Sequence, residues 1–313
     1  MPEALVTLIV PGRDIAAYAP AALDSLRGQT EQRWRAILID DGSADATGDV
    51  FAAAAAADPR FTLVRHDSPG GLGAARNTGL DLVDTPFLGF LDGDDELTPN
   101  ALERMTTTLA ETGSDFAAGA YVRSRLVDGS YRPGRVQPWT TAATDPERLA
   151  TTIFAHPAAS ANIVAWSKVS RTEFWNGRRF PLGVAYEDQI VAQRMHVEAR
   201  AFDVVPDVLV HWRLRADGTS ITQGKDLLPV LRDYLAALLG GIRVLQAAGA
   251  SAAVVARLDL ILAMDVPPLE HIASTHPEPA YRAELDAFTA TLRTLPEFAL
   301  ASPDPALSEA LRW

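Results

Sequence analysis

The sequence predicts an α/β fold: a mostly parallel, Rossmann-like sheet flanked by helices, followed by a helical carboxyl-terminal region. Three observations predict it. Within the first 125 residues, short β-rich runs alternate with helical stretches, which is typical of a parallel sheet covered on both faces. Two of these runs lead directly into paired aspartates, and from about residue 225 the composition is mainly helical.

Four β-rich runs define the strands of the predicted sheet. They lie at residues 5–10, 36–40, 61–65 and 87–91. A helix is expected from Pro20 to Gly28, because proline is favoured in the first turn of a helix and glycine just past its end. The alanine-rich stretch 42–60 predicts a second helix, with Ser43 as its cap and Pro59 as its stop.

Helical signals continue after the fourth strand. Thr98, followed by proline, predicts a helix that runs to about Gly113. Residues 144–147 form a capping-box pattern that predicts another helix start, and residues 186–199 are expected to be helical. The segment 128–145 is rich in Gly, Pro, Arg and Trp, which predicts a functional loop.

The composition excludes several classes of protein. Lys and Arg number 28 against 40 acids, a formal charge of -12, which argues against non-specific binding to nucleic acid or an anionic bilayer. The absence of cysteine excludes disulfides, thiolate zinc sites and thiol nucleophiles. No signal peptide is expected. The apolar segment 226–250 is interrupted by proline and charges, so it predicts a core helix or helix pair rather than a membrane span.

Two acidic clusters follow predicted strands, at the edge where open parallel sheets bind ligands. Asp40 and Asp41 end the second strand, and Asp92 and Asp94 follow the fourth. Gly93 between them allows a sharp turn, so that both carboxylates can approach one point. Hard oxygen ligands near phosphate suit Mg²⁺ or Mn²⁺. Taken singly, the first cluster also fits a helix cap and the second a solvated turn; their joint occurrence favours a metal and nucleotide site.

The chain resembles a known family through "VTLIVPGRD", "AILIDDGSADAT" and "GGLGAARNTGLDLVDTPFLGFLDGDDELTPNAL". Together these resemble the nucleotide-sugar-binding half of family 2 glycosyltransferases of the GT-A fold, over roughly residues 5–110. Looser similarity to the acceptor half of bacterial cell-surface members continues through "AWSKVSRTEF", "YEDQIVAQRM" and "HWRLRADGTSIT". The resemblance implies a catalytic domain at 1–224, with a nucleotide-sugar half at 1–115 and an acceptor half at 116–224, before a helical region at 225–313.

The implied reaction is an inverting, metal-dependent transfer of a sugar from a nucleoside diphosphate sugar, with UDP favoured, to a hydroxyl acceptor such as a cell-surface glycan or glycopolymer. Pro11, Gly12, Arg13 and Asp14 would border the nucleotide base, and Asp41 would accept a hydrogen bond from its ring N–H. Family members commonly have Tyr and Asn where this chain has Arg13 and Asp14. Arginine can still stack on a base, although the change leaves the identity of the base open.

The resemblance also assigns the residues around the diphosphate. Asp94 would coordinate Mn²⁺ or Mg²⁺, and Asp92, next to Gly93, would hold the ribose or a metal-bound water. His211 would bind the metal or touch the diphosphate, unless it is a structural residue of a strand. Arg76 would lie near the base or phosphate, with a salt bridge to a nearby aspartate as the alternative.

Catalysis requires a base for the acceptor proton and positive charge on the leaving phosphates. Asp188 matches the family's general base, with Glu187 orienting it or replacing it; alternatively both acids only favour the helix dipole. Arg213, Arg215 and Ser220 would donate hydrogen bonds to the leaving diphosphate, or belong to a solvated strand edge and turn. The tryptophans offer a sugar-stacking platform or core packing: Trp139, Trp166, Trp175 and Trp212.

Two rival functions stay open on the sequence. An aspartyl-phosphate phosphohydrolase also places Asp-x-Asp at a strand end, although usually on the first strand. A non-catalytic nucleotide-sugar-binding protein would keep Asp41 and Asp92 but would lack the general base. The sequence has no P-loop, HExxH or GxSxG motif, and Arg76 stands where a dinucleotide fingerprint needs its third glycine.

The expected partners are the donor and a hydroxyl acceptor, with no nucleic acid. The expected location is cytoplasmic, including peripheral association with the inner face of the cell membrane. A homo-oligomer is compatible with the sequence.

Overall fold

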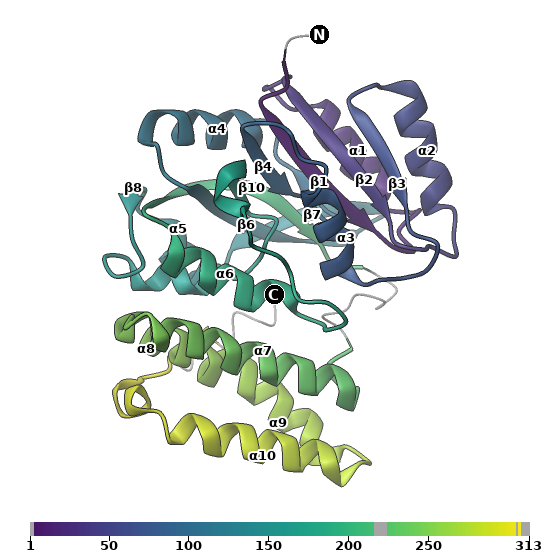
Figure 1. The fold of residues 1–313 in the computed structure, drawn as a ribbon. Coiled ribbons are helices and arrows are strands. Elements are labelled where there is room, and N and C mark those ends of the chain that lie inside the picture. The colour runs from purple at the N-terminus through teal and green to yellow at the C-terminus, as the bar shows by residue number, and fades with distance from the viewer. Residues whose placement is uncertain (1–2, 216–223, 305, 308–313) are drawn as a thin grey trace.

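The computed structural model describes residues 3–215, 224–304 and 306–307. A mixed sheet crosses the upper part of the molecule in Figure 1, with strand order β3-β2-β1-β4-β9-β6-β10-β5. Its first four strands are parallel and confirm the predicted ones. They are β1 (Val6–Gly12), β2 (Trp34–Asp40), β3 (Phe61–Arg65) and β4 (Phe87–Phe90).

The second half of the sheet begins at β9 (Lys168–Arg171), which pairs antiparallel with both β4 and β6 (Phe116–Val127). Consequently β6, and β10 (Phe202–Arg213) beside it, run in the same direction as β1 and β4. Three further strands pair with this half of the sheet: β5 (Glu96–Leu97) and β8 (Arg148–Thr151) pair with β10, and β7 (Ser130–Val136) pairs with β6. The carboxyl ends of β1, β2, β4, β6 and β10 therefore meet along one edge of the sheet.

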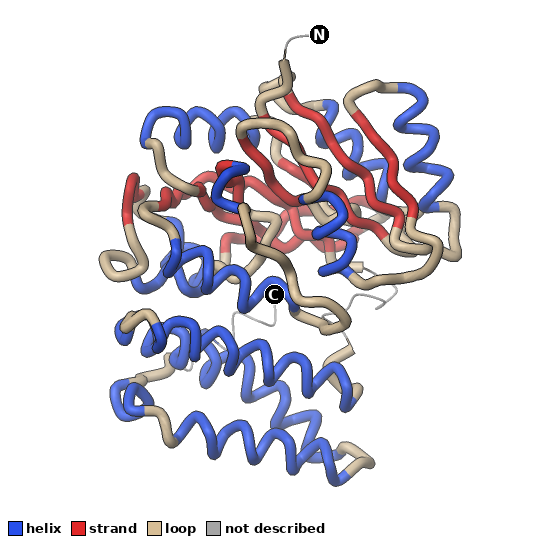
Figure 2. Tube along the Cα trace, viewed as in Figure 1, coloured by secondary structure: helices blue, strands red, loops and turns tan. Residues whose placement is uncertain are grey.

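Helices cover both faces of this sheet, as Figure 2 shows. The chain steps from β1 outward to β3 and then returns to β4, so right-handed crossovers place the helix before β4 on the face opposite the first two helices. The helices of this part are α1 (Ala19–Arg27), α2 (Thr47–Ala57), α3 (Leu72–Leu80), α4 (Ala101–Thr112), α5 (Pro138–Thr144) and α6 (Glu187–Glu198).

Two predicted helix caps are wrong because a distant partner takes the side chain. Helix α2 starts at residue 47 without a side-chain cap, and the Ser43 hydroxyl instead accepts a hydrogen bond from the Asp14 amide at 3.2 Å. Helix α4 starts at residue 101, and the Thr98 hydroxyl donates to the Val208 carbonyl at 2.8 Å. The predicted end of α4 is confirmed, with Gly113 in the left-handed conformation at φ 72°.

The expectations for residues 128–147 are also wrong. Instead of a functional loop, the segment contains β7, which forms a hairpin with β6, and α5. Helix α5 ends at Thr144 instead of starting there, and the chain continues through a cis Asp145–Pro146 bond into β8. Residues 144–147, which match the capping-box pattern, therefore lie at the end of a helix. The backbone turns there into β8, which pairs antiparallel with β10.

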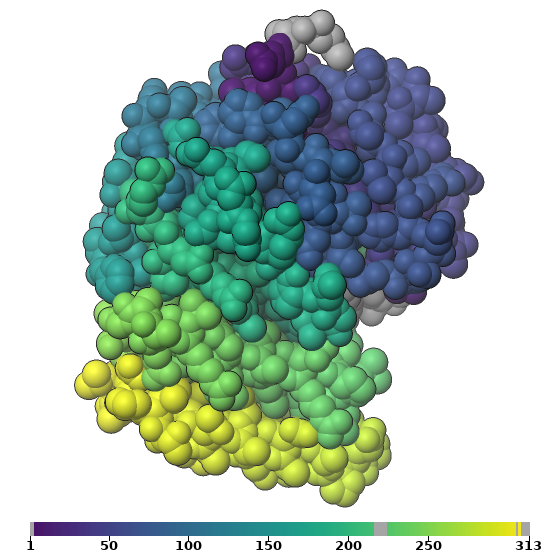
Figure 3. All heavy atoms as spheres, in the orientation of Figure 1, coloured from purple at the N-terminus to yellow at the C-terminus, as the bar shows by residue number. Residues whose placement is uncertain are grey.

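The predicted helical carboxyl-terminal region is present and forms the green-to-yellow block in Figure 3. Helix α7 packs against α6, and its 20 residues confirm the core helix expected near 226–250. None of the helices in the described part of the chain is long and apolar enough to span a bilayer. The helices of this region are α7 (Leu228–Ala247), α8 (Ser251–Leu260), α9 (Val266–Thr275) and α10 (Pro279–Arg293).

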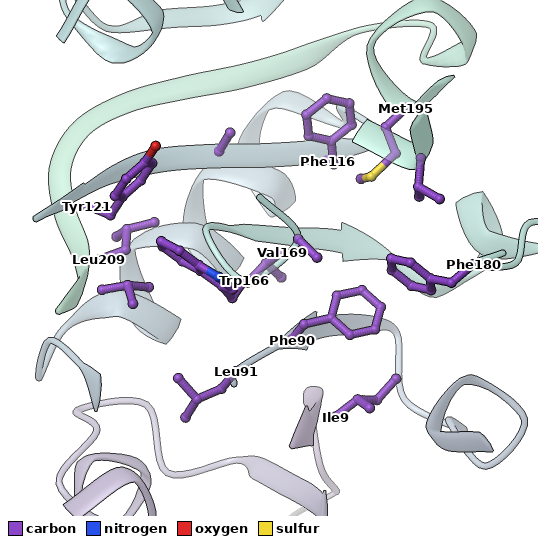
Figure 4. Packing of buried hydrophobic residues seen from close by; sticks show 14 of the residues in the cluster. Ile9, Phe90, Leu91, Phe116, Tyr121, Trp166, Val169, Phe180, Met195 and Leu209 are labelled. Carbon is purple, nitrogen blue, oxygen red and sulfur yellow. The ribbon is translucent and has the colours of Figure 1, made fainter. Parts of the chain in front are cut away.

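One buried hydrophobic cluster runs from β1 through the sheet into the carboxyl-terminal helices. Figure 4 shows its centre, where the Phe90 ring of β4 lies beside the Phe180 ring, with 5.3 Å between the ring centroids. Trp166 packs edge-on against Tyr121 at 4.8 Å. This continuous core fixes the spacing of the strands whose ends carry the candidate site.

Candidate active site

The loops after β1 and β4 are tied together at the carboxyl edge of the sheet. The Gly93 amide donates to the Pro11 carbonyl at 3.0 Å. A Cβ on Gly93 would lie 2.5 Å from Ile15 Cδ1 and 3.0 Å from that same carbonyl, so only glycine permits this approach. Gly12 packs equally closely, with Ile15 Cδ1 2.6 Å from the place of a Cβ. The close contact fixes where the flanking Asp92 and Asp94 lie.

A buried arginine connects Asp92 to the start of α6. Arg76 of α3 is 1% exposed; its Nη2 donates to Asp92 Oδ1 at 2.7 Å, and its Nη1 donates to Glu187 Oε1. The sequence left Arg76 open between a nucleotide contact and an ion pair, and the structure contains the ion pair. Arg76 thereby holds together α3, the loop after β4 and the start of α6, which are far apart in the sequence.

Asp94 lies beside the end of β10. Arg215 Nε donates to Asp94 Oδ2 at 2.7 Å, and the Arg213 guanidinium donates to the Asp94 carbonyl. Arg213 also pairs with Glu96 at 3.1 Å. The structure therefore brings Arg213 and Arg215 to Asp94, where they supply positive charge next to the predicted diphosphate position.

Asp95 has a structural role that the sequence reasoning did not identify. Its side chain is 1% exposed, and Oδ1 accepts a hydrogen bond from the Arg213 amide at 2.8 Å. Burial, together with the neighbouring Asp94 and Asp92, raises the pKa of Asp95 well above its usual range. Asp95 thus holds the end of β10 in place. The only signal for this role in the sequence was that Asp94, Asp95 and Glu96 are adjacent and cannot all face one ligand.

Asp14 ties the β1 loop to the β2 loop. Its backbone has φ 52°, a conformation that Asp and Asn tolerate better than most residues, and its Oδ1 accepts from the Ala44 amide at 2.8 Å. Arg13 is exposed and lies 3.6 Å from the Asp14 carboxylate. The guanidinium of Arg13 therefore stands at the rim where the base is expected.

Asp41 is buried at the end of β2, where it organises the loop before α3. Its Oδ1 accepts from His66 Nδ1 at 2.7 Å and from the Gly70 amide at 2.8 Å, while Oδ2 accepts from the Gly71 amide at 2.8 Å. His66 follows β3 directly, so the rule that ligands gather at strand ends also pointed to it. The predicted contact of Asp41 with a base has to use the remaining lone pair of Oδ2.

Asp188 and Glu187 begin α6 but differ in their surroundings. Glu187 is 3% exposed and bonded to Arg76. Asp188 is partly buried, and within the described residues its carboxylate accepts no hydrogen bond and forms no ion pair. Burial raises the pKa of Asp188 to about 7; the Glu187 carboxylate adds to the shift, and Arg76 and Lys168 oppose it. Asp188 is thus the unengaged carboxylate, and Glu187 is the anchor.

Burial also shapes the electrostatics around Arg76. It raises the pKa of Asp92 and of Glu187, while Arg76 lowers both. Because a buried ion pair is stable only while both partners are present, the Asp92–Arg76–Glu187 group depends on all three members. This group holds the start of α6, and therefore Asp188, relative to β4.

The residues present fit a divalent cation through two carboxylates instead of three ligands. Asp92 and Asp94 each use one oxygen for an arginine, which leaves Oδ2 of Asp92 and Oδ1 of Asp94 without a protein partner among the described residues. Mg²⁺ and Mn²⁺ take one or two carboxylates plus substrate phosphates. His211 pairs with Glu96 in the β10–β5 ladder, and the described residues group no three acidic or histidine side chains around one point, so the three-residue set is not assembled.

The other predicted residues lie elsewhere. Ser220 lies outside the described residues. Three of the four tryptophans are buried in packing contacts, with 7%, 6% and 3% exposure: Trp139, Trp166 and Trp175. Trp212 is only partly buried, and its ring also packs against Trp166, so of the four it alone keeps substantial exposed area.

Comparisons with known proteins agree with this geometry. Residues 7–169, more than half of the chain, match the family model described as "Glycosyl transferase family 2". EpsH of Bacillus subtilis is 29% identical over 214 residues, which cover 67% of this chain and 60% of EpsH. Glycosyltransferase GlyA of Streptococcus pneumoniae is 25% identical over 69% of this chain, but the match spans only 31% of GlyA.

Solved structures extend the likeness to the whole fold. The crystal structure of S. aureus TarS in complex with UDP has a TM-score of 0.67, covers 98% of this chain and 91% of the TarS chain, and is 16% identical in sequence. The same TarS fragment has also been solved with UDP-GlcNAc. The predicted GT-A architecture with a helical carboxyl-terminal region is thereby confirmed, and this chain belongs to glycosyl transferase family 2.

Proposed function

We propose that the protein transfers a sugar from a nucleoside diphosphate sugar to a hydroxyl group, with Asp188 as general base. The observation that carries this proposal is the unengaged Asp188 carboxylate, with its raised pKa, next to a rigid group of three charged residues. A pKa near the working pH suits proton transfer, because the group is then both deprotonated and basic.

The step is a single displacement that inverts the anomeric centre. The acceptor oxygen forms a bond to the anomeric carbon while the bond from that carbon to the diphosphate oxygen breaks, and the electron pair leaves with the diphosphate. The acceptor proton passes to Asp188. Glu187 is held by Arg76, so it positions Asp188 and does not compete for the proton. A second carboxylate acting as nucleophile is not needed.

The donor is proposed to bind across the carboxyl edge of the sheet. Arg13 borders the base, and Asp41 accepts its ring N–H. Arg213 and Arg215 offset the negative charge that develops on the departing diphosphate. UDP is the favoured nucleotide, supported by the fold shared with TarS, whose structures hold UDP and UDP-GlcNAc.

A divalent cation, Mn²⁺ or Mg²⁺, is proposed to lie between the donor and Asp94. Bound there, it would supply Lewis-acid stabilisation of the leaving diphosphate. Asp94 would hold it through Oδ1, and Asp92 would orient the ribose or a bound water. The two arginine contacts direct both carboxylates to this edge.

The acceptor and the location stay predictions. A cell-surface glycan or glycopolymer is the proposed acceptor class, and the cytoplasmic location and oligomeric state are expectations from the sequence. The phosphohydrolase alternative has no support from the family match. Residues 7–169, which match the glycosyl transferase model, include both acidic clusters at the strand ends.

The test combines binding and turnover. A thermal-shift panel of nucleoside diphosphates and their sugars, with and without Mn²⁺, identifies the donor, because a ligand that binds only the folded state raises its melting temperature. Release of nucleoside diphosphate is then followed for the wild type and for Asp188→Asn. A transferase gives a variant that binds donor without turnover. Release of phosphate from simple monoesters, or unchanged turnover in the variant, would contradict the proposal.

A further inference from the structure

The residue directly before the acid pair of α6 has an unusual backbone conformation. Tyr186 has φ 59° and ψ 37°, in the left-handed region that a bulky side chain rarely adopts. It is the N-cap of α6, yet its side chain makes no capping hydrogen bond within the described residues. Glycine would be favoured here if only the backbone mattered. The tyrosine side chain must therefore have contacts that offset the strain.

Helix α7 supplies these contacts. The centroid of the Tyr186 ring lies 4.5 Å from that of the Tyr234 ring on α7. One residue earlier in the loop, the Ala185 amide donates a hydrogen bond to Asp233 Oδ2 at 2.9 Å. Figure 1 shows α7 beside α6, so both contacts come from the carboxyl-terminal helical region.

The ring on which Tyr186 packs is itself held in place. Tyr234 is 3% exposed, its hydroxyl donates to Asp265, and the Lys225 ammonium lies 3.8 Å from the centre of its ring. The Tyr186 hydroxyl, in contrast, is buried without a hydrogen-bond partner among residues 3–215, 224–304 and 306–307. The contribution of Tyr186 is therefore its ring and not its hydroxyl.

The first turn of α6 needs contacts from outside the helix. The first amides of any helix have no acceptor within it, so the helix itself holds its first turn weakly. Here the Gln189 amide reaches the Tyr186 carbonyl at 3.3 Å. Arg76 holds this turn from the sheet through Glu187, and α7 holds the residues that lead into it. Asp188 lies in this same turn.

The loop that leads into α6 is also fixed at its other end. Asn77 of α3 bonds both backbone groups of Phe180: its Nδ2 donates to the carbonyl, and its Oδ1 accepts from the amide, each at 2.9 Å. Residues 182–184, between the two anchors, are exposed. Since the Phe180 end is fixed, the contacts with α7 determine the direction in which the chain enters α6.

We propose that Tyr186 and Asp233 are positioning residues for the reaction, through which the carboxyl-terminal helices direct the Asp188 carboxylate toward the acceptor hydroxyl. This inference rests on the proposed function, because it explains how the proposed base is placed. Neither residue takes a proton itself. Helix α7 is thereby part of the arrangement that makes the base effective, and not only a cover for the catalytic part.

The test compares substitutions at two adjacent residues of α7. Asp233→Ala removes the acceptor of the Ala185 amide, whereas the control Arg232→Ala breaks an exposed pair with Glu284. UDP release is measured with MnCl₂ and the UDP-sugar that the thermal-shift panel selects, at a temperature at which circular dichroism shows every variant folded. We expect Asp233→Ala to lower kcat by at least about ten-fold while the Kd of UDP stays within about two-fold, because small misplacements of a catalytic group are costly in rate. Arg232→Ala should change neither.

Two substitutions at Tyr186 separate its ring from its hydroxyl. Tyr186→Phe is the conservative variant: it keeps the ring against Tyr234 and should retain the wild-type kcat. Tyr186→Gly leaves the left-handed backbone accessible but removes the ring, and it should lower kcat by at least about ten-fold, as Asp233→Ala does. Tyr186→Gly also tests the proposal should Asp233→Ala not fold.

Hydrogen–deuterium exchange of the full chain gives a readout that does not depend on turnover. Residues 184–192 should exchange faster in Asp233→Ala than in the wild type or Arg232→Ala, because the first turn of α6 opens more often. If Asp188→Asn keeps wild-type turnover, the proposed function fails, and exchange alone decides whether α7 holds this turn. Wild-type kcat in Asp233→Ala and Tyr186→Gly, an equal loss in Arg232→Ala, unchanged exchange, or a loss caused by weaker UDP binding would overturn the positioning role.

Discussion

At the residue scale, Asp188 and Glu187 show how one helix start gives two adjacent acids different tasks. Arg76 fixes Glu187, and Asp188 has only burial and the neighbouring charge acting on it. The sequence showed that an acid pair begins a helix, but it gave no means of knowing which acid would be bonded, because the partner lies 111 residues away on α3.

Asp188→Asn is expected to lower kcat by about 10²- to 10⁴-fold, since it removes the proton acceptor while keeping the shape. UDP binding by thermal shift should not change. The matched control is Asp49→Asn, which makes the same exchange at a side chain that is 88% exposed on α2. A variant of Asp188 with near wild-type kcat would remove it from the mechanism.

The pH dependence follows from the raised pKa of Asp188. Only the deprotonated form accepts a proton, so kcat/KM should rise with pH and level off above about pH 7, instead of levelling off near pH 4 as an ordinary carboxyl would predict. Rates of the wild type measured from pH 5 to 9 check this. An acidic limb that is still present in Asp188→Asn at the same pH would assign the titration to another group.

Arg76→Met is expected to destabilise the fold by about 3–5 kcal/mol, because it leaves Asp92 and Glu187 buried without a counter-charge. Arg35→Met breaks an exposed pair with Asp84 and should cost less than about 1 kcal/mol. Urea unfolding measures both. Equal effects of the two substitutions would show that the buried group does not hold α6.

At the element scale, the parallel strands were predictable and the amino-terminal helix caps were not. The runs at β1 to β4 are continuous and apolar because both faces are covered, and this pattern is local. Thr98 and Ser43 carry capping side chains, but partners on β10 and on the β1 loop compete for them. For the same reason, the site residues at strand ends and the nearby arginines could be read from the sequence, but not which carboxylate each arginine would bond.

The approach of the β1 and β4 loops gives an element-scale prediction. Gly93→Ala places a methyl group 2.5 Å from Ile15 Cδ1 and should destabilise the protein by about 1–3 kcal/mol while weakening Mn²⁺-dependent UDP binding. Gly28→Ala is the control, since its nearest contact would be an ordinary 3.4 Å. If Gly93→Ala binds UDP and Mn²⁺ as the wild type does, the spacing of Asp92 and Asp94 does not depend on this contact.

At the scale of the whole molecule, the carboxyl-terminal helices share one core with the catalytic part. Leu231 and Leu238 of α7, and Leu285 of α10, belong to the same buried cluster as Phe51 of α2. The sequence predicted a helical region after the catalytic part, and the boundary near 224 stays a prediction. Composition alone could not show that α7 packs on α6, the helix that carries Asp188.

A shared core predicts one cooperative unfolding transition. Leu285→Ala and Phe51→Ala, placed at opposite ends of the molecule, should each lower the stability by about 2–5 kcal/mol within that single transition. Calorimetry of both variants checks this. Two separate transitions, each shifted by only one of the substitutions, would show that the helical region folds independently.

The proposed function requires that donor and catalytic base meet at the carboxyl edge of the sheet. A crystal structure with a UDP-sugar and Mn²⁺ tests this directly, because anomalous scattering locates the metal. We expect Mn²⁺ on Asp94 against the diphosphate, with the anomeric carbon between the diphosphate and Asp188. A metal or nucleotide bound elsewhere, or an anomeric carbon out of reach of Asp188, would contradict it.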